Sequence, residues 1–244
     1  MSENISYMIG KASKLFQAAG MAANPPAARA MTKTELIHER LRRGILSLEY
    51  QPGDYLNIDE LARRHQVSPI PVREAIARLA AERLVVMRPH IGAEVAPLDE
   101  TSVREVFAYL EGLETAPAED IVARATAGDL AELATILAAM DRLHLPRDLA
   151  RWDEANAGFH LRLSAIAGLP SLHDHLKRVL EHWDRIRRHF FSLSSDRGAK
   201  RAQREHRAMI KALRAKDAPL LTKLLHEHNA RARQGYLQQL ALSR

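Results

Sequence analysis

Apolar and polar positions alternate with helical spacing in the first third of the chain. Residues 34–48 carry leucine or isoleucine every three or four positions, which predicts an amphipathic helix. A Pro-Gly-Asp turn at residues 52–54 separates this helix from a short one that we expect over residues 59–65. Ser68, followed by a proline, suits an N-cap and a first helical position, so a third helix is expected over residues 68–83.

Two short apolar runs follow the third helix. Residues 84–87 predict a strand, residues 89–92 a turn, and residues 93–95 the returning strand. Two helices, a tight turn, a further helix and a hairpin are typical of a winged helix-turn-helix. We place this domain at residues 31–96.

Only helical patterns follow Pro97. Turn-forming residues divide this part into segments near residues 99–126, 129–144, 147–166, 171–191, 199–215 and 218–241. The expected fold class is mainly α, with the winged helix-turn-helix followed by an all-α bundle of six to seven helices at residues 97–244. Residues 1–30 are expected to form a poorly ordered tail, and the alternative is a short helix over residues 8–21 that docks on the body.

The residues around the third helix are similar to the motif of a known family. They are Pro52-Gly53, Leu61-Ala62, Val67-Ser68-Pro69-Ile70-Pro71-Val72-Arg73-Glu74-Ala75-Ile76, Leu79, Leu84-Val85 and Gly92. At these spacings they resemble the GntR family of bacterial transcriptional regulators. The length of the helical second part resembles the FadR-like branch, whose effector-binding part is called the FCD domain. The resemblance implies a ligand-responsive regulator that binds a pseudo-palindromic operator in double-stranded DNA as a homodimer.

The beginning of the third helix is expected to contact DNA. Recognition helices contact base edges mainly from their N-terminal end, where backbone N–H groups also favour a phosphate. Arg73 lies one turn into this helix and is expected to reach a phosphate or a guanine edge, the alternative being a solvated arginine. Arg78 is assigned either to DNA or to a surface ion pair. The resemblance further implies that the hairpin tip lies in or near the minor groove. The predicted DNA-contacting residues are Ser68, Ile70, Pro71, Arg73, Arg78, His90 and Gly92.

The motif departs from the usual family pattern in three places. Many members carry arginine and threonine where this chain has Pro69 and Ile70, so one base or phosphate contact is expected to be missing. Ile91 replaces a common basic residue at the hairpin tip. Arg83 occupies a position usually taken by glycine, where a left-handed turn costs a non-glycine residue ~1 kcal/mol.

Three histidines and an asparagine form a candidate metal site. Asn156 and His160 lie four positions apart and share one helix face, while His206 and His228 belong to later segments. FCD domains typically bind a metal through an aspartate and a histidine at this spacing plus two later histidines. The resemblance therefore implies a zinc or nickel site at His160, His206 and His228, with Asn156 in the aspartate's place. A neutral amide is a weaker ligand than a carboxylate, so the alternative is a vestigial or differently used polar pocket. His226 points to a different helix face, and the family's spacing favours His228.

A metal inside an effector domain suggests a small carboxylate effector, held by the metal and by an arginine. Organic acids and related metabolites are common effectors in this branch. Arg187 beside Trp183 is the candidate effector-binding pair. The alternative is that Arg185, Arg187 and Arg188 only cover the surface of the bundle.

Composition excludes several classes. The chain of 244 residues is 46% hydrophobic and 27% charged, which rules out a wholly disordered or collagen-like protein. It has 0 cysteines, which excludes disulfide frameworks, thiolate metal sites and cysteine nucleophiles. No stretch approaches the ~18 apolar residues of a membrane helix, and the beginning of the chain lacks a signal peptide's apolar segment. We therefore expect a cytoplasmic protein with no membrane partner.

The net charge of +6 suggests a polyanionic partner. Residues 31–95 nevertheless carry ten basic and nine acidic residues, so the DNA hypothesis depends on the placement of particular side chains. Two other classes are a metal-dependent hydrolase that uses the histidine cluster and a basic helical module that binds a membrane or RNA. The chain has no His-Glu-x-x-His, Gly-x-Ser-x-Gly or phosphate-loop motif, and so we expect that it is not an enzyme.

Overall fold

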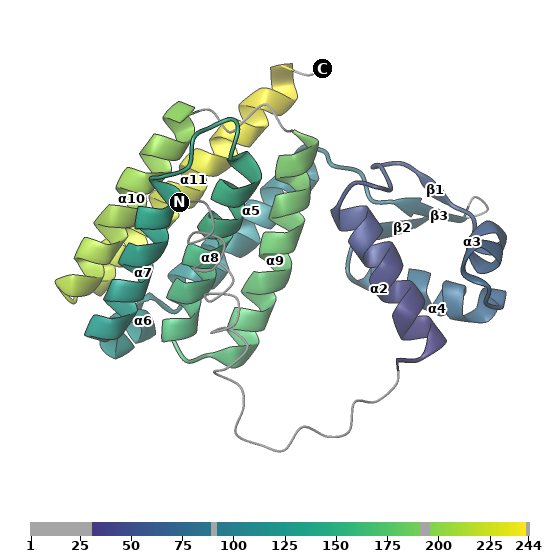
Figure 1. Ribbon diagram of the computed structural model, residues 1–244, viewed down its shortest axis with the longest axis horizontal. Helices are drawn as coiled ribbons and strands as arrows, with labels where there is room; N and C mark the ends of the chain where they lie inside the picture. The colour runs from purple at the N-terminus through teal and green to yellow at the C-terminus, as the bar shows by residue number, and fades with distance from the viewer. Residues whose placement is uncertain (1–30, 89–91, 191–195, 243–244) are drawn as a thin grey trace.

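The computed structural model describes residues 31–88, 92–190 and 196–242 and consists of a small mixed domain beside a larger helical bundle (Figure 1). The predicted tail at residues 1–30 lies outside the described residues, and so does the hairpin tip at residues 89–91 with the predicted DNA contact His90.

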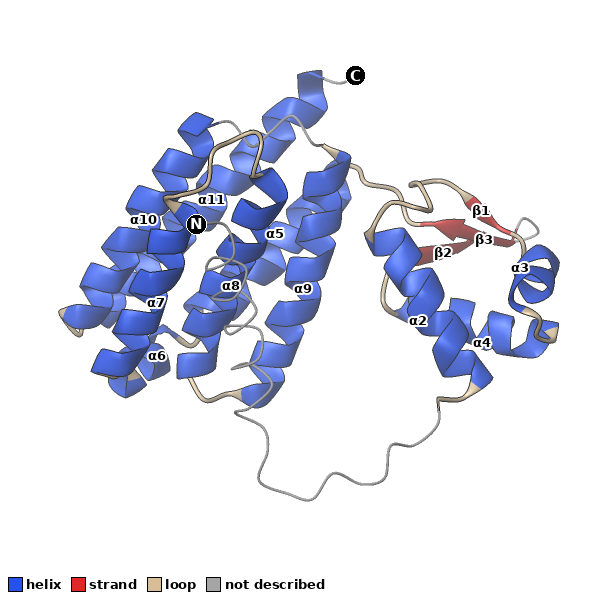
Figure 2. Ribbon diagram, in the orientation of Figure 1, coloured by secondary structure: helices blue, strands red, loops and turns tan. Residues whose placement is uncertain are grey.

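The small domain has the predicted order of elements. Its elements are α2 (Lys33–Leu46), β1 (Tyr55–Leu56), α3 (Ile58–His65), α4 (Pro69–Ala81), β2 (Val85–Arg88) and β3 (Gly92–Val95). The strands form an antiparallel sheet in the order β1-β3-β2, and all strands of the described residues belong to this sheet (Figure 2). The sequence pattern missed β1, because two residues are too few to show an alternation. The apolar residues Val72, Ile76 and Leu79 of α4 are in the core of the small domain.

Two of the left-handed backbone positions in the small domain, Arg83 and Gly92, belong to the predicted motif. Arg83 has φ 59° at the turn from α4 to β2, as expected from the glycine that many relatives carry there. Gly92 has φ 118° at the beginning of β3, and a Cβ atom at this position would lie 2.5 Å from the hydroxyl oxygen of Tyr55. Gly92 therefore allows β1 and β3 to approach closely beside the hairpin tip.

The bundle consists of seven described helices. They are α5 (Glu100–Thr115), α6 (Ala118–Arg124), α7 (Ala127–Met140), α8 (Leu149–Ile166), α9 (Pro170–His189), α10 (Asp196–Arg214) and α11 (Ala218–Leu242). The expectation of one helical segment over residues 99–126 is wrong. Pro117 has no backbone N–H to continue the hydrogen bonds of α5, and α6 begins directly after it.

The bundle has two apolar cores. One joins α6, α7, α8, α10 and α11 around Leu133, Phe159 and Met209, and the other joins α5, α9 and the end of α11 around Phe107 and Leu176. Several buried polar side chains from α5, α8, α10 and α11 accompany these cores. No helix among the described residues is both long and apolar enough to cross a membrane.

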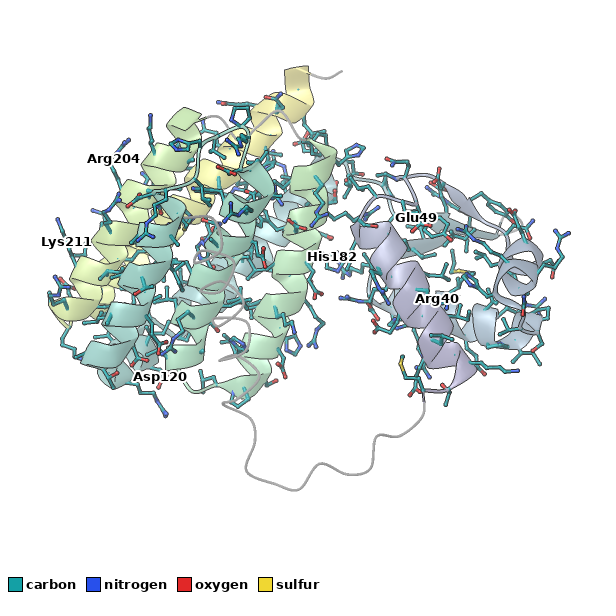
Figure 3. All side chains as sticks on the ribbon, in the orientation of Figure 1. Arg40, Glu49, Asp120, His182, Arg204 and Lys211 are labelled. Atoms are coloured by element: carbon teal, nitrogen blue, oxygen red, sulfur yellow. The ribbon has the colours of Figure 1, made fainter. Side chains whose placement is uncertain are left out.

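Helix α9 carries contacts between the two domains, and Arg83 at the turn after α4 also pairs with Glu105 of α5 at 3.0 Å. Arg185 is 2% exposed, and its Nη2 donates a hydrogen bond of 2.6 Å to the backbone carbonyl of Ala96 in the connecting segment. Burial lowers the pKa of Arg185 to about 10. One turn before Arg185 on α9, Glu181 contacts Arg42 of α2. The neighbouring His182 lies on the side of α9 that faces the small domain (Figure 3).

Candidate metal centre and DNA-contacting face

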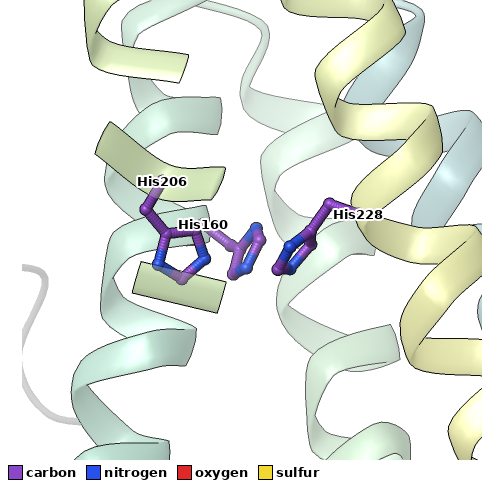
Figure 4. A group of neighbouring side chains, drawn as sticks. All are labelled: His160, His206 and His228. Atoms are coloured by element: carbon purple, nitrogen blue, oxygen red, sulfur yellow. The ribbon is translucent and has the colours of Figure 1, made fainter. Parts of the chain in front are cut away.

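His160 of α8, His206 of α10 and His228 of α11 converge inside the bundle (Figure 4). One ring nitrogen from each lies within 4.8 Å of the other two. The ring centroids are 5.3 Å apart for His160 and His206, 5.2 Å for His160 and His228, and 5.0 Å for His206 and His228. Within the described part of the chain, these side chains alone form such a group. The three predicted histidines are thus brought together, and this buried cluster could bind a metal.

The histidine triad, His160, His206 and His228, is shielded from solvent. His160 is 5% exposed, His206 0%, and the side chain of His228 11%. Burial, together with the neighbouring His228 and His160, holds the pKa of His206 well below its usual value. His206 is therefore neutral, which is the form that binds metals, and its Nε2 is buried without a hydrogen-bond partner among the described residues.

An oxygen atom lies beside the Nδ1 atom of each histidine. His228 Nδ1 donates a hydrogen bond of 2.7 Å to Glu205, and His206 Nδ1 lies 3.4 Å from the amide oxygen of Gln203. Glu114 Oε1 lies 2.7 Å from His160 Nδ1, off the direction of the ring N–H, so this contact is mainly electrostatic. These contacts leave the Nε2 atoms available to a metal.

Sequence reasoning missed Glu114. This residue is 5% exposed on α5, and it continues the buried face of Val103, Phe107 and Leu110. Burial alone would raise the pKa of its carboxyl group, but His160 and a hydrogen bond from Asn229 lower it by more. The signal in the sequence was a glutamate at an apolar position of an amphipathic helix, which indicates a buried carboxylate with a specific partner.

Asn156 belongs to a polar stripe on the inner face of α8. Asp153, Asn156, His160 and Ser164 follow one another at spacings of three or four, and all four are buried. Each has one buried polar atom with no hydrogen-bond partner among the described residues: Asp153 Oδ1, Asn156 Oδ1, His160 Nδ1 and Ser164 Oγ. His160 Nδ1 lies against Glu114, whereas the other three atoms indicate that the stripe faces a polar ligand, an ion or water, because such atoms are rare in protein interiors.

The predicted effector-binding pair, Arg187 and Trp183, lies at the Asp153 end of this stripe. Arg187 is 5% exposed and pairs with Asp153 and Asp184, and its guanidinium carbon lies 5.8 Å from the ring centre of Trp183. Burial raises the pKa of Asp153 to about 6 although Arg187 opposes this effect. The alternative that the arginines of α9 only cover the bundle surface is wrong for Arg185 and Arg187, because both are buried.

The outer face of α4 presents most of the predicted DNA contacts. Ile70 is 66% exposed, and Ser68, Arg73 and Arg78 are also exposed. No ion pair of Arg73 or Arg78 is found in the described part of the chain. Ser68 occupies the N-cap position without a side-chain capping hydrogen bond.

One predicted DNA contact needs correction. Pro71 is buried on the inner face of α4, because that side of the helix packs against α2 and α3. Its side chain belongs to the domain core and is not presented to a duplex. Gly92 is only partly buried and contributes backbone beside the hairpin tip.

Comparison with known proteins gives matches to both domains. Residues 33–95 match the model of the bacterial regulatory proteins of the gntR family, and residues 105–231 match the FCD domain. The transcriptional repressor RspR of Escherichia coli is 27% identical over 193 residues, which are 79% of this chain and 83% of RspR. The gluconate operon transcriptional repressor of Bacillus licheniformis is 28% identical over 83% of this chain and 84% of its own length.

A solved structure shows the same fold. The Escherichia coli protein McbR/YncC superposes with a TM-score of 0.66 at 20% identity, covering 86% of this chain and 99% of that protein. The curated relatives are transcriptional regulators and not enzymes, so the interpretation of the histidine cluster as a hydrolase site has no support among them.

Proposed function

Since the chain belongs to the GntR family of bacterial transcriptional regulators and carries an FCD domain, we propose that it binds a pseudo-palindromic operator as a homodimer and responds to a small organic acid bound beside the histidine triad. The observation that carries the proposal is the pairing of two features in one chain. One is an exposed recognition helix with unpaired arginines, and the other is a buried polar interior lined by three histidines.

The DNA-binding part of the proposal is supported by the charges on α4. Among the described residues, the guanidinium groups of Arg73 and Arg78 have no ion pair to break before they bind a phosphate or a base edge. The small domain is nearly neutral as a whole, so its affinity for DNA of unrelated sequence should be low. In a homodimer, two such helices would contact successive half-sites about one helical turn apart.

The chemistry of the triad fits a divalent transition metal. Three neutral imidazoles are a common ligand set for zinc and also suit nickel, and the buried Nε2 of His206 without a partner is a suitable donor. A bound metal would supply a Lewis-acidic position for a carboxylate oxygen. Asn156, one turn from His160, would offer a neutral amide oxygen to the same site.

The polar stripe of α8 supports an elongated effector site. Asp153, the partner of Arg187, lies seven residues before His160, which is about 10 Å along the helix. An organic acid between the triad and Arg187 would pass the buried amide oxygen of Asn156 and contact the unpartnered Nε of Arg187. Trp183 would cover the arginine end of the site. To regulate, the acid must bind the DNA-competent and the DNA-incompetent dimer with different affinities.

Fluorescence anisotropy of the full chain on a duplex from the region upstream of its own gene tests the proposal. We expect binding at least ~10³-fold tighter than to a scrambled duplex of equal length. A duplex with only one half-site should bind much more weakly than the complete site. Equal affinity for the native and scrambled duplexes would overturn the proposal.

A further inference from the structure

Glu114 is a buried carboxylate with no arginine or lysine beside it among the described residues. Its Oε1 lies 2.7 Å from His160 Nδ1, and its other oxygen, Oε2, accepts a hydrogen bond of 2.6 Å from the neutral amide of Asn229. No arginine or lysine pairs with it in the described part of the chain. A buried carboxylate is costly unless a cation neutralises it, so Glu114 favours positive charge on or beside His160, which a metal bound to that ring would supply.

The other carboxylate of the site differs in this respect. Glu205 also faces a histidine, at 2.7 Å from His228 Nδ1, but its Oε1 lies 2.8 Å from Arg231 Nε. Arg231 therefore already balances the charge of Glu205. Of the two carboxylates around the triad, Glu114 is the one without an arginine partner in the described part of the chain.

The contact with Glu114 also fixes which nitrogen of His160 carries the proton. At 2.7 Å a carboxylate oxygen and a nitrogen lone pair would repel each other, so Nδ1 is the protonated nitrogen and Nε2 has the lone pair. Gln203 acts similarly, because its amide nitrogen donates to Leu137 and Asp141 and its oxygen is therefore turned toward His206. All three rings are thus oriented with Nε2 as the metal-binding atom.

The triad itself provides no negative charge. Imidazole is a neutral ligand, and Asn156, one turn before His160 on α8, is neutral as well. We propose that Glu114 is a positioning residue of this site: it holds His160 through Nδ1 and balances the charge of a divalent metal at the triad. This inference rests on the metal site of the proposed function.

The arrangement has a consequence for effector binding. With a neutral set of direct protein ligands, an incoming organic acid meets no carboxylate already bound to the metal. The charge that stabilises the metal lies behind His160, on the far side of the ring from Nε2. The carboxylate that helps to retain the metal and the position at which an anionic effector binds are therefore in two different places of the site.

Zinc affinity of the full chain, measured by competition with a chromogenic chelator after removal of metal, tests the proposal. We expect Glu114→Gln to bind zinc 10- to 100-fold more weakly, and Glu205→Gln to show a smaller loss. Glu111→Gln is the matched control. Glu111 lies one turn before Glu114 on α5 and contacts a histidine of α11, His226, at the same 2.7 Å, but that histidine is outside the triad.

A second variant separates charge from a folding defect. Asn156→Asp restores a carboxylate at the triad, so in the Glu114→Gln background it should recover most of the lost zinc affinity. Long-range ¹H–¹⁵N spectra of the imidazoles provide a readout that a merely structural role would not move. In the zinc-loaded protein, Glu114→Gln should shift the Nδ1–H resonance of His160 and leave that of His206 in place.

The outcomes distinguish this inference from the metal site itself. If Glu114→Gln binds zinc within twofold of the wild type while His206→Ala does not bind it, the role of Glu114 is wrong and the metal site stands. If Glu114→Gln loses affinity and Asn156→Asp does not restore it, the loss is structural and the inference is overturned. If the wild type binds zinc no better than His206→Ala, the metal site itself fails.

Discussion

Arg42 of the small domain donates a hydrogen bond of 2.5 Å to Glu181 of α9, and its Nε donates a second of 2.8 Å to Glu82 of its own domain. The side chains of Arg42 and Glu181 are 17% and 33% exposed. Helix α9 also carries Arg187 at the proposed effector site and Arg185 at the connecting segment. One helix therefore contacts the interior of the bundle, the connecting segment and the DNA-binding domain.

Replacing Glu181 by Gln should loosen the docking of the small domain. The variant loses a partly buried charge-assisted hydrogen bond, worth about 1 kcal/mol, so amide exchange in α2 and α9 should quicken about fivefold. Hydrogen–deuterium exchange with mass spectrometry measures this change. The control is Glu105→Gln, which removes the exposed pair of Glu105 with Arg83 and should have almost no effect. Equal effects of the two variants would contradict a special role for Arg42 and Glu181.

Replacing Arg73 by Ala should weaken operator binding at least tenfold, because its unpaired guanidinium lies on the exposed face of α4. If it contacts a phosphate, the slope of log affinity against log salt should also fall by about 1. Anisotropy titrations between low and moderate salt measure both quantities. Arg104→Ala, which removes an arginine paired with Glu100 in the bundle, is the control and should leave DNA binding unchanged. Unaltered binding by Arg73→Ala would contradict the assignment of α4 as the recognition helix.

Ile70 should read thymine methyl groups. It is an isoleucine 66% exposed in the first turn of α4, where a major-groove contact is expected and apolar side chains favour the C5 methyl of thymine. Replacing single thymines of the operator by deoxyuridine removes only this methyl. At one position per half-site, wild-type affinity should fall about fivefold, while Ile70→Ala should bind both duplexes equally. A wild type that is insensitive to every such replacement would show that Ile70 contacts no thymine.

The sequence predicted secondary-structure elements and local motifs better than contacts between residues that lie far apart in the chain. The helices followed from apolar spacing, and the left-handed turn at Arg83 followed from a departure from the family motif. The break at Pro117 was missed because the apolar pattern continues across it. Local patterns do not show which side of a helix another helix will cover, which is why Pro71 was assigned to DNA.

The interior of the candidate metal centre also shows how little local patterns reveal about contacts between helices. The three histidines were found from a resemblance in spacing, yet Glu114, forty-six positions before His160, offered only an unusual polar residue on an apolar face. Arg187 was selected, but its burial depends on Asp153, which lies 34 positions away along the chain. Such pairs depend on how helices pack, and their formation is not encoded in any short segment.

Zinc should stabilise the wild type and not His206→Ala. A ligand that binds only the folded state at about 100 times its Kd adds about 2.7 kcal/mol, which raises the Tm by roughly 5–10 °C in a domain of this size. Thermal unfolding with and without zinc measures the shift. His226→Ala is the control, because His226 is exposed and lies outside the triad on the same helix as His228, and it should retain the full shift. A similar shift in His206→Ala would place the metal elsewhere.

An organic acid bound beside the triad should control DNA binding. The operator affinity of the full chain with added zinc, measured during titration with a panel of organic acids for the wild type and His206→Ala in parallel, tests this directly. We expect that at least one acid changes wild-type affinity about tenfold, while His206→Ala binds the operator but does not respond. An acid that changes the affinity of both proteins equally, or no response from the wild type to any acid, would contradict it.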